Sequence, residues 1–370
     1  MAKLCEVCNF QGGSQPPKDE WSLENKDGYV RMLQIRDFTQ SERVTPEYIK
    51  VTNTTKICAE SDILIARYGA SIGKILTGLA GAYNVAIMRT IPDERILKKK
   101  YLYYYLNSSY FQNSIMSVGS RAAQAGFNKE DLAKLHIKCP SFNEQETIIN
   151  TLVKVERIVE NRKRQLKELD ILIKARFVEM FGDENNSKSW AKVQVEDVAE
   201  IQVGVVIKPA QYYTDKEHGV KTFRSLNVGE MYIKDTDWVY FSEEGNRKNI
   251  KSQLHENDLL IVRSGLPGTS CVVTKKYEGC NAIDVIIARP NTKIVNSQYL
   301  CAYTNFPHGR KQIEEGTGGA AQQHFNVGKY KTMQLMLPPL KLQNQFAAFA
   351  AQTDKSKVAI GYTSYRDYAR

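Results

Sequence analysis

Three groups of residues have types and spacings that chemistry could use, but none completes a catalytic motif. Gly69-Ala-Ser-Ile-Gly-Lys74 resembles a phosphate-binding loop, yet it is one residue short and is followed by Ile75 where Ser or Thr would hold magnesium. A tight glycine turn after a strand is the favoured interpretation. Cys5 and Cys8 lack a second Cys or His pair at zinc spacing, so buried structural thiols are favoured over a metal site. The five histidines are isolated and form neither an HExxH motif nor a recognisable triad.

Two kinds of nucleic-acid enzyme would also leave a signature in the sequence. An amino-methyltransferase uses an Asn/Asp-Pro-Pro-Tyr/Phe loop for the flipped base and a glycine-rich turn for its methyl donor, and the chain contains neither. A magnesium-dependent nuclease needs two acids and a nearby Lys. The Asp/Glu-x-Lys triplet occurs only at Glu24-Asn25-Lys26, which no Pro-Asp precedes. We therefore expect a binding protein without a catalytic site or a metal, and a new kind of enzyme is a remote alternative.

Two loops in each half of the chain have the composition of a nucleic-acid contact. The first loop spans residues 67–74 and, in the second half, 263–270; the second loop spans 117–124 and 316–324. Their glycines allow close approach to a phosphate, with hydroxyls and cations beside it, while Arg and Gln can read base edges. The candidate DNA-binding residues are Arg67, Tyr68, Ser71, Lys74, Ser120, Arg121, Gln124, Arg263, Ser264, Thr269, Lys275, Lys276, Thr317, Gln322 and Gln323.

The two arginines of the first loops have a structural alternative. Arg67 and Arg263 could instead pair with Asp62 and Asp258, which lie five residues before them, or cap strands. Both interpretations stay open from the sequence.

These loops belong to an internal repeat, which the sequence carries at a nearly constant offset. Asp62-Ile-Leu-Ile-Ala-Arg-Tyr-Gly69 returns as Asp258-Leu-Leu-Ile-Val-Arg-Ser-Gly265. Further matches hold an offset of 198 residues: Tyr101, Tyr105, Asn107, Phe127, Asn128, Pro140 and Gln145 return as Tyr299, Tyr303, Asn305, Phe325, Asn326, Pro338 and Gln343. Such a period indicates a duplicated module. Positions that differ between the copies, such as Tyr68, Lys74, Arg121, Lys275 and Lys276, are the better candidates for sequence reading.

Each copy is expected to be an α+β domain followed by a long helix. Short buried strands are predicted at Ile63–Ala66, Val85–Met88, Leu259–Val262 and Ala282–Ala288, with further strands at Lys192–Gly204, Val220–Leu226 and Tyr232–Phe241. Helices rich in Tyr and Leu are predicted at Leu97–Met116 and Asn296–Ile313.

The stretch between Pro140 and Asp183 predicts one long helix, because no Pro or Gly interrupts it before Gly182. Ser141 or Asn143 can cap its start. Its apolar residues recur every 3.5 residues, the period of a coiled-coil seam. The predicted seam residues on this helix are Ile148, Leu152, Val155, Val159, Leu166, Leu169 and Ile173. An ordinary long surface helix is the alternative interpretation.

A second helix beginning at Gln343 is the candidate partner for this seam. Phe346, Ala350 and Thr353 fall where the first helix has Ile148, Leu152 and Val155, but residues 361–370 carry no seam. We expect antiparallel pairing with only part of the long helix, and a frayed C-terminal tail.

Composition and charge bound the class of protein. The chain has 370 residues, 42% of them hydrophobic and 25% charged, as expected for a globular protein of two or three domains. It contains no membrane-length apolar run or signal peptide, and its odd number of cysteines, seven, favours reduced thiols and the cytoplasm. The net charge of +10 divides as +5 in residues 1–142, −1 in 143–186, +4 in 187–342 and +2 in 343–370. Two basic domains joined by a neutral spacer indicate that the ligand is a polyanion such as DNA.

The sequence resembles the specificity (S) subunit of type I restriction–modification systems over nearly its whole length. The resemblance depends on the long central helix of residues 139–183, on Leu337-Pro-Pro-Leu-Lys-Leu-Gln-Asn-Gln345 at the start of the distal helix, on Phe10-Gln-Gly-Gly-Ser-Gln-Pro-Pro-Lys18, and on the loop Asp62-Ile-Leu-Ile-Ala-Arg-Tyr-Gly-Ala-Ser-Ile-Gly-Lys74. The Pro-x-x-x-x-Gln helix starts, duplicated in register, are the most specific of these features.

The resemblance implies two target-recognition domains, each reading half of a split DNA sequence, and an antiparallel coiled coil that sets the spacer. It implies that two N6-adenine methyltransferase (M) subunits, and restriction (R) subunits where restriction occurs, assemble on this chain. S-adenosylmethionine, ATP and magnesium would be bound by those partners and no cofactor by this chain. The distal helix is shorter than the family pattern, which leaves the docking of the second methyltransferase open.

We therefore predict four parts. They are target-recognition domain 1 in residues 1–142, the spacer helix in 143–183, target-recognition domain 2 in 187–340, and a shortened distal helix with a frayed tail in 341–370. Binding of double-stranded DNA without membrane association is the predicted function. The alternative is a non-catalytic coiled-coil scaffold for protein partners, and a homodimer of the isolated chain stays open.

Overall fold

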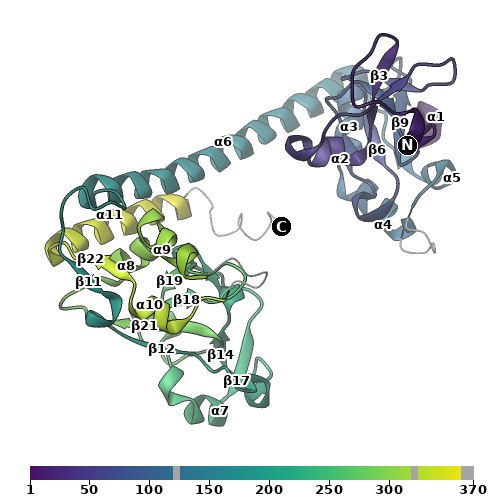
Figure 1. The fold of residues 1–370 in the computed structure, drawn as a ribbon. Helices are drawn as coiled ribbons and strands as arrows, with labels where there is room; N and C mark the ends of the chain where they lie inside the picture. Colours follow the sequence, from purple (N-terminus) through teal and green to yellow (C-terminus); the bar gives the residue numbers. More distant parts are fainter. Residues whose placement is uncertain (120–125, 318–323, 360–370) are drawn as a thin grey trace. The chain divides into compact units, whose positions relative to one another are not determined.

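The computed structural model describes residues 1–119, 126–317 and 324–359 (Figure 1). The chain forms two compact units, Met1–Glu160 and Asn161–Arg370, and one helix, α6 (Phe142–Phe181), contributes to both. The structure describes no helix long and apolar enough to cross a membrane within those ranges.

The first unit contains two four-stranded sheets and a small two-stranded one. The main sheet has the order β2-β9-β6-β7 with all neighbours antiparallel. The second sheet has the order β4-β3-β8-β5, in which β3 and β8 are parallel. The bounds are β1 (Ala2–Lys3), β2 (Cys8–Gly12), β3 (Tyr29–Leu33), β4 (Tyr48–Lys50), β5 (Ile57–Cys58), β6 (Leu64–Ala66), β7 (Ile75–Leu76), β8 (Gly81–Tyr83), β9 (Ile87–Pro92) and β10 (His136–Ile137). Strands β1 and β10 form the third sheet.

The second unit repeats the main sheet, and its second sheet keeps the parallel pair but has its additional antiparallel strand at the opposite edge. Its main sheet has the order β12-β21-β18-β19, again antiparallel throughout, and its second sheet β13-β17-β14-β20 contains the parallel pair β14–β20. The bounds are β11 (Lys192–Gln194), β12 (Ala199–Val203), β13 (Tyr213–Thr214), β14 (Gly219–Phe223), β15 (Val228–Gly229), β16 (Tyr232–Ile233), β17 (Val239–Ser242), β18 (Leu259–Val262), β19 (Ser270–Val272), β20 (Asn281–Ala282), β21 (Val285–Pro290) and β22 (Gln334–Met336). The duplicated α+β module that the sequence predicts is therefore present.

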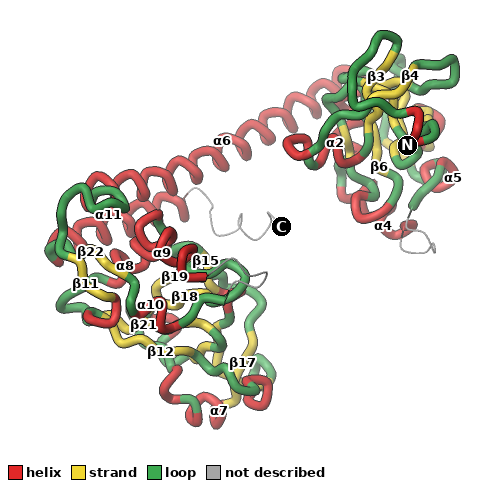
Figure 2. The backbone as a smooth tube through the Cα atoms, in the orientation of Figure 1, coloured by secondary structure: helices red, strands yellow, loops and turns green. Residues whose placement is uncertain are grey.

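Helices cover the sheets in both units (Figure 2). In the first unit they are α1 (Leu4–Val7), α2 (Ile35–Thr39), α3 (Lys99–Leu106), α4 (Ser109–Gly119) and α5 (Lys129–Leu132). In the second they are α7 (Glu243–Lys248), α8 (Ser297–Asn305), α9 (Pro307–Thr317), α10 (Val327–Lys331) and α11 (Leu340–Ala359).

Some elements are more broken than the sequence pattern predicts. The single helices expected at Leu97–Met116 and Asn296–Ile313 are each two helices, α3–α4 and α8–α9. In the second unit Pro307 supplies the break, because proline cannot donate a hydrogen bond inside a helix but fits its first turn. The strands expected at Lys192–Gly204 and Tyr232–Phe241 are likewise each two strands.

The repeated tyrosines hold the small two-stranded sheet against a helix. In the first unit the hydroxyls of Tyr101 and Tyr105 donate to the carbonyl oxygens of Lys138 and His136, both at 3.1 Å. The second unit makes the equivalent pair of bonds 198 residues later. They join Tyr299 to Met336 at 2.7 Å and Tyr303 to Gln334 at 3.0 Å.

The repeated glutamine joins the start of the following helix to the body of its module. Gln145 is fully buried; its side-chain oxygen accepts from the backbone N–H of Lys98 at 2.9 Å. Its amide nitrogen donates to the carbonyls of Ile96 at 2.8 Å and Pro140 at 2.9 Å. Gln343 repeats these contacts with Asn296, Ile294 and Pro338. The glutamine thus satisfies three backbone polar groups where helix and module meet.

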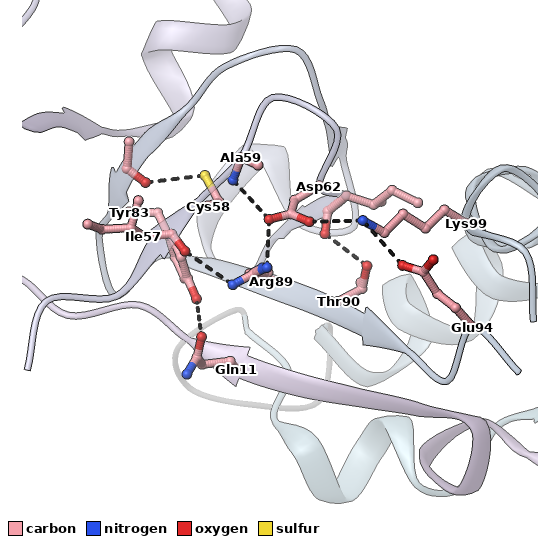
Figure 3. A network of polar contacts seen from close by, with 12 residues as sticks. Gln11, Ile57, Cys58, Ala59, Asp62, Tyr83, Arg89, Thr90, Glu94 and Lys99 are labelled. Atoms are coloured by element: carbon pink, nitrogen blue, oxygen red, sulfur yellow. Dashed lines mark hydrogen bonds and ion pairs between the residues drawn. The ribbon is translucent and has the colours of Figure 1, made fainter.

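The repeated aspartate that precedes the main-sheet strand forms a buried ion pair (Figure 3). Asp62 accepts from the backbone N–H of Ala59 at 2.9 Å, and its carboxylate contacts Arg89 at 2.8 Å and Lys99 at 3.4 Å. Asp258 is equally buried and binds the guanidinium of Arg289 through two hydrogen bonds of 2.9 Å.

Helix α6 is continuous over 40 residues, or about 60 Å. Its cap is Ser141: the Ser141 backbone N–H donates to Glu144 at 2.9 Å, and the Glu144 N–H donates to the Ser141 hydroxyl at 3.4 Å. At the other end Gly182 has φ +87°, and its carbonyl accepts from Nε2 of the buried His308 at 3.0 Å.

Within the second unit, α6 and α11 run antiparallel. Phe177 of α6 lies 5.1 Å from Phe346 near the start of α11, whereas Asp170, earlier in α6, pairs with Lys357 near the end of α11 at 2.8 Å. On α11 Phe346, Ala350 and Thr353 are buried. Lys357, four residues after Thr353 on the same face, is buried as well.

The predicted seam residues of α6 divide into two sets. Leu166 and Ile173 are buried and Leu169 is half-buried. By contrast Ile148, Val155 and Val159 are exposed in this chain, Val155 by 50%, and Leu152 is half-buried. Beyond Ile173 the buried face consists of Phe177 and Phe181, four residues apart, which the 3.5-residue pattern does not include. These two rings lie in the core of the second module, so a globular surface rather than a single helix sets their spacing. The tail from residue 360 lies outside the described residues.

Candidate nucleic-acid interface

In each copy the first loop that the sequence singles out is joined to the end of the second loop or to the residues that directly follow it. A bridge of antiparallel β type joins Tyr68 to Gly126 in the first unit and Ser264 to His324 in the second. The backbone N–H of Phe325 also donates to the carbonyl of Arg263 at 2.7 Å. Residues about 60 positions apart thus form one surface at the end of the main sheet in each module.

The first loop is a tight turn between two antiparallel strands. Gly69 has φ +70° and the equivalent Gly265 has φ +88°, a conformation that glycine adopts without strain. The turn in the first unit leads into β7, whereas a phosphate-binding P-loop leads into a helix. The structure therefore confirms the glycine turn rather than the P-loop.

Arg67 and Arg263 are engaged within their own modules. Arg67 Nε donates to the carbonyl oxygen of Phe127 at 3.3 Å, and its guanidinium lies 5.0 Å from the ring centroid of Tyr68. Arg263 is directed at the corresponding carbonyl of Phe325, with Nε at 3.5 Å, and its side chain is only 13% exposed. The alternative that these arginines pair with Asp62 and Asp258 is wrong, because Arg89 and Arg289 occupy those carboxylates. Both arginines instead fasten one loop to the other.

The second unit adds three polar contacts around Arg263 that the first unit does not share. Arg263 Nη1 binds Asp284 at 2.6 Å, and Nη2 lies 2.6 Å from His324 Nε2. The other ring nitrogen of that histidine, Nδ1, lies 2.7 Å from the Ser264 hydroxyl. Asp284 has φ +47°, a left-handed conformation that Asp tolerates better than most residues do.

The two residues joined by the bridge are one large and one small in each copy, and the large one is on opposite strands in the two copies. In the first unit the ring of Tyr68 covers Gly126, and a Cβ placed on that glycine would lie 2.5 Å from the tyrosine ring. In the second unit the ring comes from the other strand, as His324, and the small residue is Ser264. The two surfaces therefore keep one backbone and present different chemical groups.

The remaining predicted contacts fall into three groups. Lys74 and Lys275 are exposed, Tyr68 is 40% exposed and Ser71 is half-buried. Thr269 is a poor candidate because it is only 8% exposed in the loop before β19. Ser120, Arg121, Gln124, Gln322 and Gln323 lie outside the described residues, as does the side chain of Thr317.

Lys276 is exposed but is held by a carboxylate. Asp235 contacts Lys276 at 2.6 Å, Lys221 at 2.7 Å and the indole N–H of Trp238 at 2.6 Å. Hydrogen bonds from Lys221 and Lys276 hold the pKa of Asp235 well below its usual range, so the carboxylate is charged at neutral pH. One carboxylate thus compensates one of two lysines, and the cluster keeps a single net positive charge.

Sequence reasoning placed His324 in the second loop without naming it as a candidate contact, and it missed Asp284. Their signal was available: both differ from the residues at the same place in the first copy, Gly126 and Ala86. Among the described residues no group of three or more His, Cys, Asp or Glu side chains could hold a metal ion. Burial raises the pKa of the Cys8 thiol to about 12, as expected for a structural cysteine.

Fold and surface together define a class: a duplicated α+β module in which each copy presents a pair of joined loops, with a long helix contributing to both units. The family comparison agrees with this class. A family model described as the type I restriction modification DNA specificity domain matches residues 1–170 and 187–362. The chain belongs to this family.

Curated relatives are specificity subunits of type I restriction enzymes from Methanocaldococcus jannaschii. The MjaVIII specificity subunit is 23% identical over 246 residues, covering 62% of this chain and 55% of that protein. The MjaIX specificity subunit is 19% identical over 380 aligned positions, covering 94% of this chain and 84% of that protein. This chain thus spans about half the length of the first relative and most of the second.

Two solved structures have the same fold. A chain from a study of complex assembly and conformational transition of the type I R-M system superposes with a TM-score of 0.59 at 16% identity, covering 97% of this chain and 90% of that one. The S subunit of a type I restriction–modification system from M. genitalium superposes with a TM-score of 0.54 at 14% identity, covering 99% and 93%.

Proposed function

We propose that this chain is the DNA-recognition subunit of a type I restriction–modification complex, with each module reading one half of a split site. The observation that carries the proposal is the pair of joined loops in each module. Arg67 and Arg263 fasten the loops in the same way in both copies, whereas the residues joined by the bridge differ. A shared scaffold with different exposed groups suits two readers of two different sequences. The family match does not favour the alternative of a protein-binding scaffold.

The proposal includes double-stranded DNA and two N6-adenine methyltransferase subunits as partners, in the cytoplasm. Helix α6 supports a protein partner because it exposes large apolar side chains: Ile158 is 58% exposed and Ile171 56%. S-adenosylmethionine would be bound by the methyltransferases, and ATP and magnesium by restriction subunits where these are present. Catalysis would take place on those partners, because this chain carries no catalytic motif.

An exchange of modules tests the proposal. Residues 1–142 are replaced by the corresponding segment of another specificity subunit, and methylated sites in the host genome are mapped by sequencing. One half of the methylated sequence should change and the other half and the spacer should stay. The matched exchange of residues 187–340 should change only the other half. A change in both halves after either exchange, or no methylation that depends on this chain, would contradict the proposal.

A further inference from the structure

We propose that the Ser264 hydroxyl in the second unit donates a hydrogen bond to an acceptor on a base edge of DNA, and that His324 is the positioning residue that directs this hydroxyl outward. The inference rests on the proposed function and assigns one reading group within it.

The contacts of His324 decide which ring nitrogen carries the proton. A guanidinium has only N–H donors, so His324 Nε2, 2.6 Å from Arg263 Nη2, must accept. The proton of the neutral ring is therefore on Nδ1, which lies 2.7 Å from Ser264 Oγ. A doubly protonated ring would direct an N–H at the guanidinium, which offers no acceptor.

The position of this proton determines whether the Ser264 hydroxyl donates or accepts. Because Nδ1–H donates to Ser264 Oγ, the hydroxyl oxygen is used as an acceptor and its own hydrogen is directed elsewhere. Ser264 is exposed, and among the described residues Oγ has no second hydrogen-bond partner. Its O–H is therefore not used by any described residue and can donate to a ligand.

The same geometry excludes a nucleophilic serine. A general base would need an unprotonated nitrogen facing the hydroxyl, as in a Ser-His-Asp triad. Here the nitrogen that faces Ser264 bears the proton, and the unprotonated nitrogen faces Arg263. The arrangement orients a donor and cannot activate an attacking oxygen.

Charge balance favours a base edge over a phosphate as the acceptor. The Arg263 charge is compensated by Asp284 at 2.6 Å, so Ser264 stands beside a group without net charge. A hydroxyl can bind either group, but without an uncompensated cation beside it its attraction to a phosphate is weak, whereas a neutral hydroxyl can still donate to the acceptors that bases present in a groove. The position also differs between the copies: Tyr68 and Gly126 stand where the second unit has Ser264 and His324.

The experiment selects duplexes from a randomised library with the full chain, together with the methyltransferase subunits if binding requires them. Ser264→Ala should weaken discrimination at one base pair of one half-site by about 2- to 10-fold, the range for a single neutral hydrogen bond. Ser264→Thr keeps the hydroxyl and should retain the preference. His324→Phe keeps the ring and removes the donor, so it should cause the same loss at the same base pair. His324→Asn restores an N–H donor and should recover the preference.

His255→Ala is the matched control. His255 is also exposed and hydrogen-bonded, to Glu278 at 2.9 Å, but it precedes β18 at the end of the strand opposite to Arg263. It should leave all base preferences unchanged. A uniform loss of affinity for every sequence in Ser264→Ala would place the hydroxyl on a phosphate and overturn the base-edge assignment. Unchanged selection in both Ser264→Ala and His324→Phe would also overturn it, whereas a wild-type chain that selects no sequence would overturn the proposed function itself.

Discussion

The polar residues that recur in both copies act mainly inside the fold. Tyr101, Gln145 and Asp62 contact backbone groups or buried partners, and their equivalents in the second unit do the same. Duplication preserved them because each satisfies groups that burial would otherwise leave without hydrogen bonds. Where the two loops meet, by contrast, the bridged residues differ: Tyr68 and Gly126 in the first unit, Ser264 and His324 in the second.

Gln343 allows a direct test of this structural role. Gln343→Leu keeps the volume but leaves the Asn296 N–H and the Pro338 carbonyl without partners, which should lower the free energy of unfolding by about 2–4 kcal/mol. Gln352→Leu, on the exposed face of the same helix, should change it by less than about 0.5 kcal/mol. Urea unfolding of both variants measures the difference. Equal effects would show that the buried amide is dispensable.

His308 predicts a dependence of stability on pH. Burial lowers its pKa, so the unfolded chain binds a proton at a higher pH than the folded chain does. Stability contributed by the neutral ring is present above the unfolded pKa of about 6.5 and is lost as pH falls through and below that value. The free energy of unfolding at pH 7.5 and 5.5 should therefore fall more in the wild type than in His308→Gln, which can still donate to Gly182. A pH response of the same size in the variant would contradict this origin.

At the scale of elements, α6 has different environments along its length. Its C-terminal part supplies Ile173, Phe177 and Phe181 to the core of the second module, while Val155 and Val159 remain exposed. The 3.5-residue period predicts one face of a helix, but it does not say which turns of that face are covered. A partner helix of 20 residues, α11, covers only part of a helix of 40.

Two isoleucines on α6 test this division. Ile173 is buried and Ile171 is 56% exposed on the same helix. Ile173→Ala should lower the free energy of unfolding by about 2–4 kcal/mol through lost packing and a residual cavity, and Ile171→Ala by about 0.5 kcal/mol or less. Chemical denaturation of the isolated chain compares them. A larger loss in Ile171→Ala would mean that this exposed face is covered, as in a homodimer.

At the scale of the whole molecule, the positive charge is divided between both halves of the chain, and some of it is compensated locally. Lys74 has an exposed ammonium without a described partner, whereas Lys276 shares Asp235 with Lys221. Net charge from the sequence therefore overstates the number of cations free to meet phosphates.

Salt dependence of DNA binding measures this difference. Lys74→Ala should reduce the slope of log K against log salt by about 1, as expected for the loss of one phosphate contact. Lys276→Ala should reduce the slope by less, because Asp235 already compensates part of the charge. Lys248→Ala, whose ammonium pairs with Glu244 at 2.7 Å on α7, serves as a control and should leave the slope unchanged. An unchanged slope in Lys74→Ala would place that lysine outside the contact.

Sequence alone was sufficient for the duplication, the α+β class, the long helix with its Gly182 end, and the family. Each of these depends on local periods, on helix breakers or on motifs repeated in register. Such features can be recognised without knowing which residues are in contact in the fold. The helix cap at Ser141 and the splits of α3–α4 and α8–α9 needed the structure, because neighbouring candidates compete at a helix end.

Only tertiary structure decided which polar side chains are internal and which are available to a ligand. Arg263 looked like a DNA contact, but Asp284, His324 and Phe325, 21 to 62 residues away in the chain, occupy its guanidinium. The choice of a hydrogen-bond partner is made across the fold and leaves no periodic trace in the sequence. For that reason the sequence located the two loops, and the structure showed how their described side chains divide between holding the loops together and facing outward.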